Sequence, residues 1–169
     1  MRKLLILITG LAATTLALVF PGTANATQFN TWSTFSSRLC MGVQGGNMTP
    51  GTAIIAWTCD GSLNQLWTAD SNSGQTGYYL FRNAADTTEC LSVFQMETTN
   101  GAPLVIWPCK DQSSNQDQRW QVPPFTNIFP LRNWASNLQI VPSGGQGSQL
   151  WLWDSRVPYN WTAHNFTNI

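Results

Sequence analysis

The sequence CMGVQGGNMTPGTAIIAWTCDGSLNQLW, from Cys40 to Trp67, contains features that the chain uses more than once. Its two cysteines lie 19 positions apart, a tryptophan stands two positions before the second cysteine, and a Gln-x-Trp triplet follows. The same features return between Cys90 and Trp120, again with cysteines 19 positions apart. A third copy near the C-terminus keeps a tryptophan at Trp153 but has no cysteine. Repetition of this kind indicates a domain built from similar units.

A glycine six residues before a tryptophan marks all three copies. The pairs are Gly51 and Trp57, Gly101 and Trp107, and Gly147 and Trp153. The short apolar runs inside these pairs, bounded by turn-forming residues, predict β-strands, and no segment shows a helical period. We expect an all-β domain with three repeats, approximately 27–76, 77–124 and 125–169, closed on itself so that no sheet edge is exposed.

Alternation along these three strands separates two faces. One face is apolar in every copy and is expected to form the core: Ile54, Ala56, Leu104, Ile106, Leu150 and Leu152. The other face carries Trp57, Trp107 and Trp153, where a flat ring can either stack on a ligand or cover a neighbouring loop. Both alternatives stay open for Trp57 and Trp107, whereas packing is favoured for Trp153.

The N-terminus has the features of an export signal. A basic start precedes an apolar run from Leu4 to Phe20, and Ala24 to Ala26 provides small residues for cleavage. An uncleaved membrane anchor is the alternative, because the run is nearly long enough to span a bilayer, but the cleavage site disfavours it. We expect residues 1–26 to be a signal peptide, and residues 27–169 to form one secreted, extracellular domain without a membrane span.

The four cysteines are expected to form disulfides, because exported chains fold in an oxidising compartment. Of the three possible pairings, the equal spacing favours one bridge in each copy: Cys40 with Cys59 and Cys90 with Cys109. Metal binding is the alternative, but the chain has no Cys-x-x-Cys spacing and His164 is its one histidine. We therefore expect neither a metal nor a cofactor.

Composition limits the partners of the domain. Residues 27–169 carry six basic and eight acidic side chains, and only 9% of the whole chain is charged. A net charge of −2 without a basic cluster argues against nucleic acid and anionic lipid as ligands. Nine tryptophans beside many Asn, Gln, Ser and Thr side chains suit a neutral, polyhydroxylated ligand, and they suit a densely packed β-domain equally well.

Two Gln-x-Trp triplets, Gln65–Trp67 and Gln118–Trp120, each follow a cysteine pair, and this arrangement resembles the ricin B-chain type lectin domain. The resemblance covers residues 27–169 and implies a β-trefoil in which Trp67 and Trp120 are core residues. It implies a sugar site in each repeat, made by an aspartate, an aromatic ring and the Asn-Gln pair of Asn-Gln-x-Trp. The residues it assigns to carbohydrate binding are Trp57, Asn64, Gln65, Trp107, Asp117 and Gln118.

The chain departs from this pattern at the aspartate, which is replaced by Gly42, Ser92 and Gln139 in the three repeats. Loss of a charge-assisted contact of roughly 1.5–3 kcal/mol would weaken a shallow site by one or two orders of magnitude. Asp60 or Asp117 could supply a carboxylate from another position. We expect weak binding of galactose-type sugars or polysaccharide through the first two repeats.

Two other functions compete with sugar binding. A trefoil with lost sugar sites could be the cell-binding or protein-docking subunit of a secreted multicomponent toxin, with a partner protein seated on Trp151, Trp153 and Trp161. An enzyme is disfavoured, because His164 has no recognisable nucleophile partner and no acid–base pair stands out. We expect a non-catalytic protein.

Overall fold

The computed structural model describes residues 30–34, 37–70, 77–110, 115–123 and 128–165. The predicted signal peptide, residues 1–26, lies outside the described residues. Within the described part, no helix has the length and apolar character needed to cross a membrane.

The described elements are short strands and single 3-10 turns, which follow the same order in the first two repeats, whereas the third repeat has strands only among its described elements. The first repeat contains β1 (Asn30–Thr34), β2 (Leu39–Val43), η1 (Gln44–Gly46), β3 (Ile54–Thr58), η2 (Leu63–Gln65) and β4 (Leu66–Asp70). The second contains β5 (Tyr78–Asn83), β6 (Glu89–Val93), η3 (Phe94–Met96), β7 (Leu104–Pro108), η4 (Gln116–Gln118) and β8 (Trp120–Gln121). The third contains β9 (Ile128–Phe129), β10 (Arg132–Asn133), β11 (Gln139–Pro142), β12 (Leu150–Trp153) and β13 (Trp161–Asn165). The prediction of an all-β domain with three repeats is confirmed.

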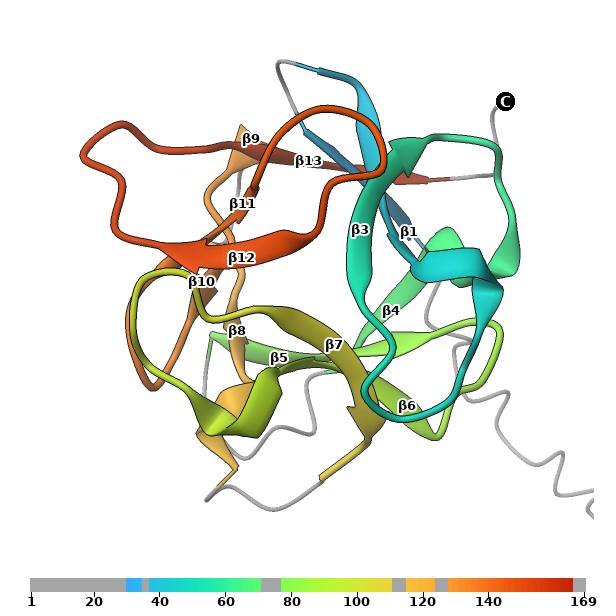
Figure 1. The fold of residues 1–169 in the computed structure, drawn as a ribbon, viewed down its shortest axis with the longest axis horizontal. Helices are drawn as coiled ribbons and strands as arrows, with labels where there is room; N and C mark the ends of the chain where they lie inside the picture. Colours follow the sequence, from blue (N-terminus) through green and yellow to red (C-terminus); the bar gives the residue numbers. More distant parts are fainter. Residues whose placement is uncertain (1–29, 35–36, 71–76, 111–114, 124–127, 166–169) are drawn as a thin grey trace, which may run out of the picture.

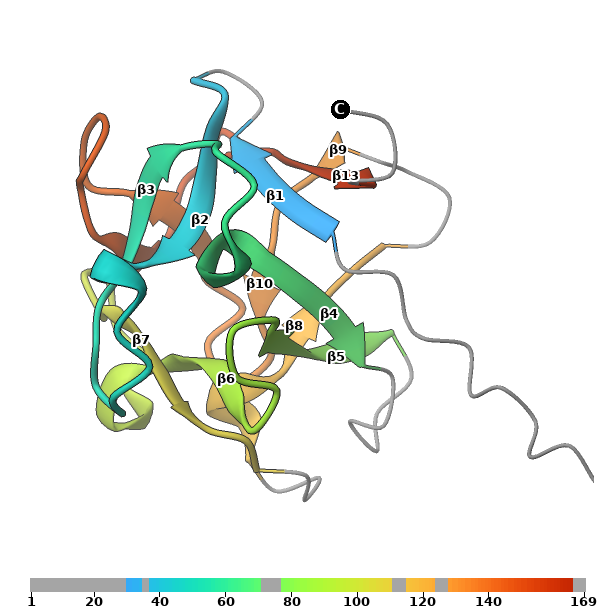
Figure 2. The ribbon, with the colours of Figure 1, turned by 90° about the vertical axis from the view of Figure 1, so that its right-hand side faces the viewer.

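Strands from all three repeats form a closed ring. β1 pairs with β4, β4 with β5, β5 with β8 and β8 with β10, while β9 pairs with β13 and β13 returns to β1. Since only Pro130 and Leu131 separate β9 from β10, the two act as one interrupted strand and the ring is complete. In Figure 2 the strands β1, β4 and β5 lie on one side of the molecule, and β3 and β7 lie on the other. The fold is a β-trefoil barrel capped by hairpins.

The three capping hairpins, β2–β3, β6–β7 and β11–β12, hold one another in a cycle. Figure 1 shows β3, β7 and β12 arranged around the middle of the molecule. The glycine before each of these strands donates its N–H to the neighbouring repeat: Gly51 to Ile106 O (2.8 Å), Gly101 to Leu152 O (2.9 Å) and Gly147 to Ala56 O (2.7 Å). All three glycines have positive φ (92°, 87° and 83°), a conformation that favours glycine. This geometry explains the Gly-to-Trp repeat of the sequence.

The core follows the predicted alternation. All six residues assigned to the inner face are fully buried: Ile54, Ala56, Leu104, Ile106, Leu150 and Leu152. Trp67 and Trp120 are also fully buried, as the resemblance implies, and Trp161 takes the same position in the third repeat. Their indole N–H groups donate to Met41 O, Leu91 O and Ile140 O at 2.9, 3.1 and 3.0 Å. Each of these large rings is thus buried without an unsatisfied donor.

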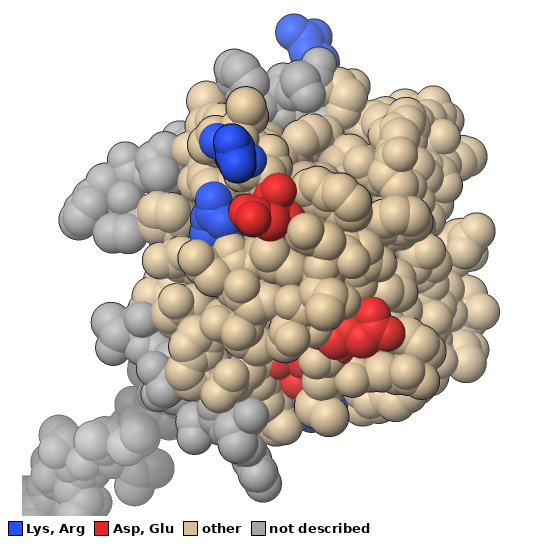
Figure 3. All heavy atoms as spheres, turned by 60° about the vertical axis from the view of Figure 1, so that its left-hand side comes forward, with Lys and Arg blue, Asp and Glu red and all other residues tan. Residues whose placement is uncertain are grey.

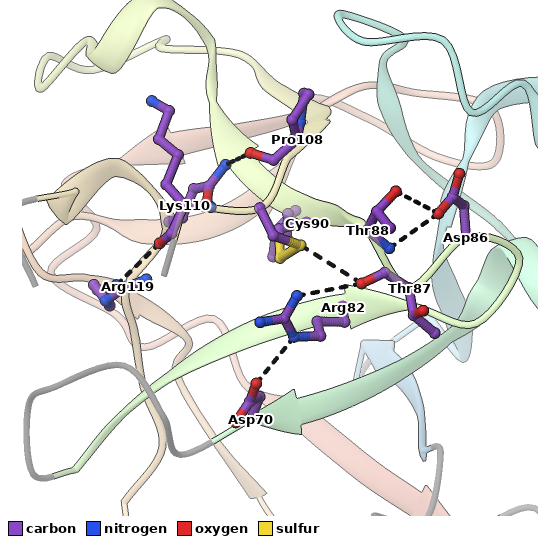
Figure 4. The surroundings of a disulfide bond; sticks show 12 residues. Asp70, Arg82, Asp86, Thr87, Thr88, Cys90, Pro108, Lys110 and Arg119 are labelled. Carbon is purple, nitrogen blue, oxygen red and sulfur yellow. Dashed lines mark hydrogen bonds and ion pairs between the residues drawn. A yellow bond between two sulfur atoms is a disulfide. The ribbon is translucent and has the colours of Figure 1, made fainter. Parts of the chain in front are cut away.

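Both predicted disulfides are present, Cys40–Cys59 and Cys90–Cys109, with Cα atoms 5.0 and 4.9 Å apart. Each bridge joins the outer ends of a capping hairpin, one residue beyond the strand that carries the exposed tryptophan. Figure 4 shows Arg82 beside Cys90, donating to Asp70 Oδ2 (2.9 Å) and to the carbonyl of Thr87 (3.3 Å). This arginine links the barrel strands to the loop that leads into the second hairpin.

Candidate functional site

Two hollows lie at equivalent places in the first and second repeats. Hollow 1 has a volume of about 540 Å³, and its lining includes Gly42, Gly45, Gly46, Trp57, Asp60, Asn64 and Gly147. Hollow 2 has a volume of about 220 Å³, and its lining includes Ser92, Phe94, Met96, Trp107, Lys110 and Asp117. Each hollow lies between the hairpin of its repeat and the 3-10 turn that opens the Gln-x-Trp strand.

The tryptophans before the second cysteines lie on the outer face, as the strand alternation predicted. Trp57 and Trp107 are 42% and 39% exposed, and each borders its hollow. Each ring also lies against a glycine of another repeat: a methyl group added at Gly147 would come within 3.4 Å of Trp57 Cζ3, and one at Gly51 within 3.8 Å of Trp107 Cζ3. The rings are therefore held in place by packing while a large part of each surface stays accessible.

The two glutamines of the triplets are buried and hold the ends of the hairpins. Gln65 accepts the N–H of Asp60 (3.1 Å) and donates to Thr58 O (2.9 Å). Gln118 accepts the N–H of Lys110 (2.8 Å) and donates to Pro108 O (3.0 Å). Each amide thus fixes the segment around the second cysteine of its repeat. Gln65 borders hollow 1, and sugar contact by either glutamine stays a prediction.

Hollow 1 carries polar groups along one side. Asn64 is half-buried and donates its Nδ2 to Val43 O at 2.9 Å. Asp60 accepts hydrogen bonds from the hydroxyl (2.5 Å) and the N–H (2.9 Å) of Ser62. These bonds, that of the hydroxyl most of all, lower the pKa of Asp60 below its ordinary value. Hollow 1 is therefore lined by an amide and by an ionised carboxylate.

Gly42 is required by its surroundings in the first repeat. A Cβ atom at this position would lie 2.9 Å from Gln65 Cγ, closer than side chains tolerate. An aspartate at position 42 would therefore displace the glutamine that holds the end of the hairpin. The absence of the expected carboxylate in hollow 1 is thus linked to the way Gln65 is placed.

Hollow 2 contains a buried carboxylate at a different position. Asp117 is 4% exposed, and its Oδ2 accepts from Ser92 Oγ (3.0 Å) and Lys110 Nζ (3.1 Å). No group among the described residues donates to its other oxygen, Oδ1, which is buried. A buried acceptor without a donor is costly. The carboxylate missing at Ser92 is thus present within hydrogen-bond distance of it.

The third repeat differs because Gln139 fills the position of the aspartate. Its side chain is fully buried, donating to the carbonyls of Ser155 (3.3 Å) and Val157 (3.2 Å) and accepting the N–H of Tyr159 (3.0 Å). Trp153 is 43% exposed, like its counterparts, but the polar group that would face a sugar is used internally.

The predicted docking patch of Trp151, Trp153 and Trp161 is wrong in one member. Trp161 is fully buried in the core, because it is the third copy of the Gln-x-Trp tryptophan. Trp151 is half-buried and pairs with Pro103 across the hairpins. The exposed large apolar side chains described in this repeat are instead Ile128, Trp153 and Val157.

Two buried asparagines position the site, and the sequence reasoning missed them. Asn83 donates to Asn64 O at 3.0 Å, and Asn133 donates to Gln116 O at 3.1 Å, so each holds the 3-10 turn of the preceding repeat. The signal was present, since the pair Arg-Asn ends the first strand of both the second and the third repeat.

Charged groups are sparse on the surface around these features. Figure 3 shows one face of the molecule, where small groups of charged atoms are separated by wide uncharged areas. Among the described residues, no three His, Cys, Asp or Glu side chains are close enough to hold a metal ion. The polar residues that line the hollows can form hydrogen bonds beside an aromatic ring.

The sequence profile of the ricin-type beta-trefoil lectin domain matches residues 31–158. The chain belongs to this lectin-domain family. No curated protein matches the chain well enough in sequence to be counted as a relative.

Solved structures share the fold of this lectin domain. The designed three-fold symmetric protein ThreeFoil is 18% identical with a TM-score of 0.70, over 80% of this chain and 96% of that one. The β-trefoil lectin of the Vibrio vulnificus hemolysin/cytolysin, solved with N-acetyl-D-lactosamine bound, is 20% identical with a TM-score of 0.60, over 83% and 96%. An exo-β-1,3-galactanase from Clostridium thermocellum is 18% identical with a TM-score of 0.70, over 82% of this chain and 30% of that one. At these identities the similarity concerns the fold.

Proposed function

We propose that this lectin-family chain is a secreted, non-catalytic protein that binds carbohydrate through hollows 1 and 2. The observation that carries the proposal is the pairing, in both hollows, of a half-exposed tryptophan with polar side chains: Asn64 and Asp60 in hollow 1, and Ser92, Lys110 and Asp117 in hollow 2. A sugar ring has an apolar face that stacks on an aromatic ring and an edge of hydroxyl groups that needs donors and acceptors. Both hollows offer the two kinds of surface side by side.

In hollow 2 the sugar stacks on Trp107, and its hydroxyl groups face the polar lining residues Ser92, Lys110 and Asp117. Lys110 and Ser92 already hold Oδ2, so the carboxylate is fixed before the ligand arrives. In hollow 1 the sugar stacks on Trp57 and contacts the Asn64 amide and the Asp60 carboxylate. Galactose-type sugars, free or as part of a polysaccharide, are the proposed ligands. Shallow single sites give weak binding, which two sites on one domain strengthen on a polymer.

The test is a glycan array followed by calorimetry with the strongest ligand, using Trp57→Ala, Trp107→Ala and the double variant. Each single change should weaken binding about tenfold by removing the stacking surface, and the double variant should not bind detectably. Trp153→Ala is the matched control, because Trp153 is equally exposed but lies in the repeat where Gln139 fills the site. A double variant that binds like the unchanged protein would exclude both hollows.

Protein docking is the second candidate, and the third repeat favours it. Trp153 and Val157 are exposed beside a sugar position that Gln139 occupies, which leaves an apolar area without a polar site. A toxin-type partner subunit would seat there. The test is a stable complex with a co-expressed neighbouring gene product. Loss of the complex in the double variant Trp153→Asp with Val157→Asp, and its retention in Trp57→Ala with Trp107→Ala, would establish docking at the third repeat. Loss of the complex in the second double variant alone would reject docking there.

A further inference from the structure

Hollow 2 differs from hollow 1 in the turn at its rim. In hollow 1 this turn contains Gly45 and Gly46, with φ of 61° and 66°. In hollow 2 the equivalent positions are Gln95 and Met96, with φ of 51° and 59°. The two turns thus have the same left-handed backbone, but only the first uses the residue for which that conformation is unstrained.

Two consecutive non-glycine residues in the left-handed region are a sign of backbone strain. Strain of this kind persists where the surrounding structure imposes it, and it gathers at ligand-binding positions. The turn in hollow 1 shows that glycine fits the same backbone. The side chains of Gln95 and Met96 are therefore present despite a backbone conformation that glycine would adopt more easily.

The side chains of this turn give hollow 2 an apolar wall. Met96 is 62% exposed although it is a large apolar side chain, and it lines the hollow together with Phe94, Val105 and Trp107. The corresponding turn of hollow 1 offers Gln44 and two glycines. The lining of hollow 2 also includes the polar residues Ser92, Lys110 and Asp117. Hollow 2 is also smaller than hollow 1, with a volume of about 220 Å³ against about 540 Å³.

We propose that hollow 2 selects a sugar that carries a methyl-terminated substituent, whereas hollow 1 does not discriminate for such a group. The methyl group packs against Phe94 and Met96, while the ring stacks on Trp107 and its hydroxyl groups face the polar lining of the hollow. This specificity rests on the proposed sugar binding. The methyl group has two chemical sources, the acetamido group of an N-acetyl sugar and the C6 methyl of a 6-deoxy sugar.

The experiment measures binding by NMR titration in a Trp57→Ala background, which leaves hollow 2 as the site under study. Two matched pairs serve as probes: N-acetylgalactosamine against galactose, and L-fucose against L-galactose. At least one methyl-bearing member should bind about fourfold tighter than its partner, which is the ratio expected for burial of one methyl group. The pair that shows the difference identifies the source of the methyl group.

Variants of the wall then assign the selectivity to its residues. Met96→Gly suits the local backbone, and it should reduce the ratio to about one because it removes part of the apolar wall. Phe94→Ala is the second variant with the same expected result. In the reciprocal change, Gln44→Phe with Gly46→Met in a Trp107→Ala background should give hollow 1 the preference. A Cβ atom at Gly46 would have Asn64 Cγ 4.0 Å away as its nearest neighbour, so a side chain fits there.

The outcomes separate this inference from the proposed function. Equal binding of both members of each pair, or a preference that survives Met96→Gly and Phe94→Ala, overturns the selectivity and leaves sugar binding intact. Absence of binding to all four sugars, or binding unchanged by Trp107→Ala in the Trp57→Ala background, overturns the proposed function of hollow 2 and the selectivity with it.

Discussion

A buried glutamine holds the end of the capping hairpin in all three repeats, but it comes from two different positions. In the first two repeats it belongs to the Gln-x-Trp triplet, as Gln65 and Gln118. In the third repeat Tyr159 stands at that place, and Gln139 reaches the loop from the opposite strand. Gln139 thus holds the end of the third hairpin as Gln65 and Gln118 hold the first two, but it does so from the position where the family pattern has the aspartate. The three repeats thus share one scaffold although the residues at the equivalent positions differ.

The largest effects should come from features that the three repeats share equally. Replacing Trp67, Trp120 or Trp161 by alanine should each lower the free energy of unfolding by about 3–5 kcal/mol, because a buried ring and a buried hydrogen bond are lost together. Urea unfolding followed by circular dichroism measures the loss. Trp153→Ala is the exposed control and should cost far less. If Trp161→Ala lowered the free energy of unfolding as little as this control, Trp161 would not be equivalent to Trp67 and Trp120.

The glutamines should come next, and they test whether the two positions do the same work. Gln118→Ala and Gln139→Ala should each cost about 1–3 kcal/mol, because each leaves buried backbone groups without a partner. Sugar titration separates them: Gln118→Ala should also weaken binding in hollow 2, and Gln139→Ala should not change binding. Weaker binding in Gln139→Ala would show that the third repeat contributes a site.

Backbone strain at the two rims should produce smaller effects of opposite sign. Met96→Gly should raise the free energy of unfolding by about 1 kcal/mol, since glycine relieves the left-handed conformation, and Gly45→Ala should lower it by about the same amount. A Cβ atom at Gly45 meets nothing within 4 Å, so the second change tests the backbone alone. Thermal unfolding of both variants is the measurement, and equal signs would exclude strain as the cause.

The smallest effect concerns a charge that only the second repeat contains. Burial, with a smaller contribution from the charge of Asp86, raises the pKa of Glu89, whose counterpart in the first repeat is Leu39. The folded state favours the protonated form of Glu89. The contribution of Glu89 to the stability of the fold is therefore present below the ordinary pKa near 4.5, and it is lost as the pH rises through the raised pKa. Glu89→Gln should therefore raise the melting temperature at pH 7 and leave it unchanged near pH 3. Destabilisation at pH 7 would contradict the burial argument.

The repeating strands, disulfides and core positions were predictable from the sequence. The hydrogen bonds between residues far apart in the sequence were not. Glycine, cysteine and tryptophan spacings indicate the repeats, the disulfides and the outer position of Trp57 because each is fixed by local geometry. The buried role of Trp161 was missed, since its triplet begins with Tyr159 and hides the motif.

Hydrogen-bond partners explain the remaining differences. The contact between Ser92 and Asp117 joins residues 25 positions apart, and no spacing in one sequence reveals it. The same holds for Gln139, whose side chain could equally have faced a ligand. The turns held by Asn83 and Asn133 belong to the preceding repeats, so their role appears only when the repeats are assembled.

The glycine that closes hollow 1 against Trp57 is Gly147, in the third repeat. The hydrogen bonds among the hairpins likewise run from the first repeat to the second, to the third and back, and β1 pairs with β13. Hollow 1 is therefore incomplete until almost the entire chain has been synthesised. Contacts of such long sequence separation make folding slow compared with an array of self-contained repeats. A fragment lacking the last repeat should retain no lectin site at all, rather than two sites out of three.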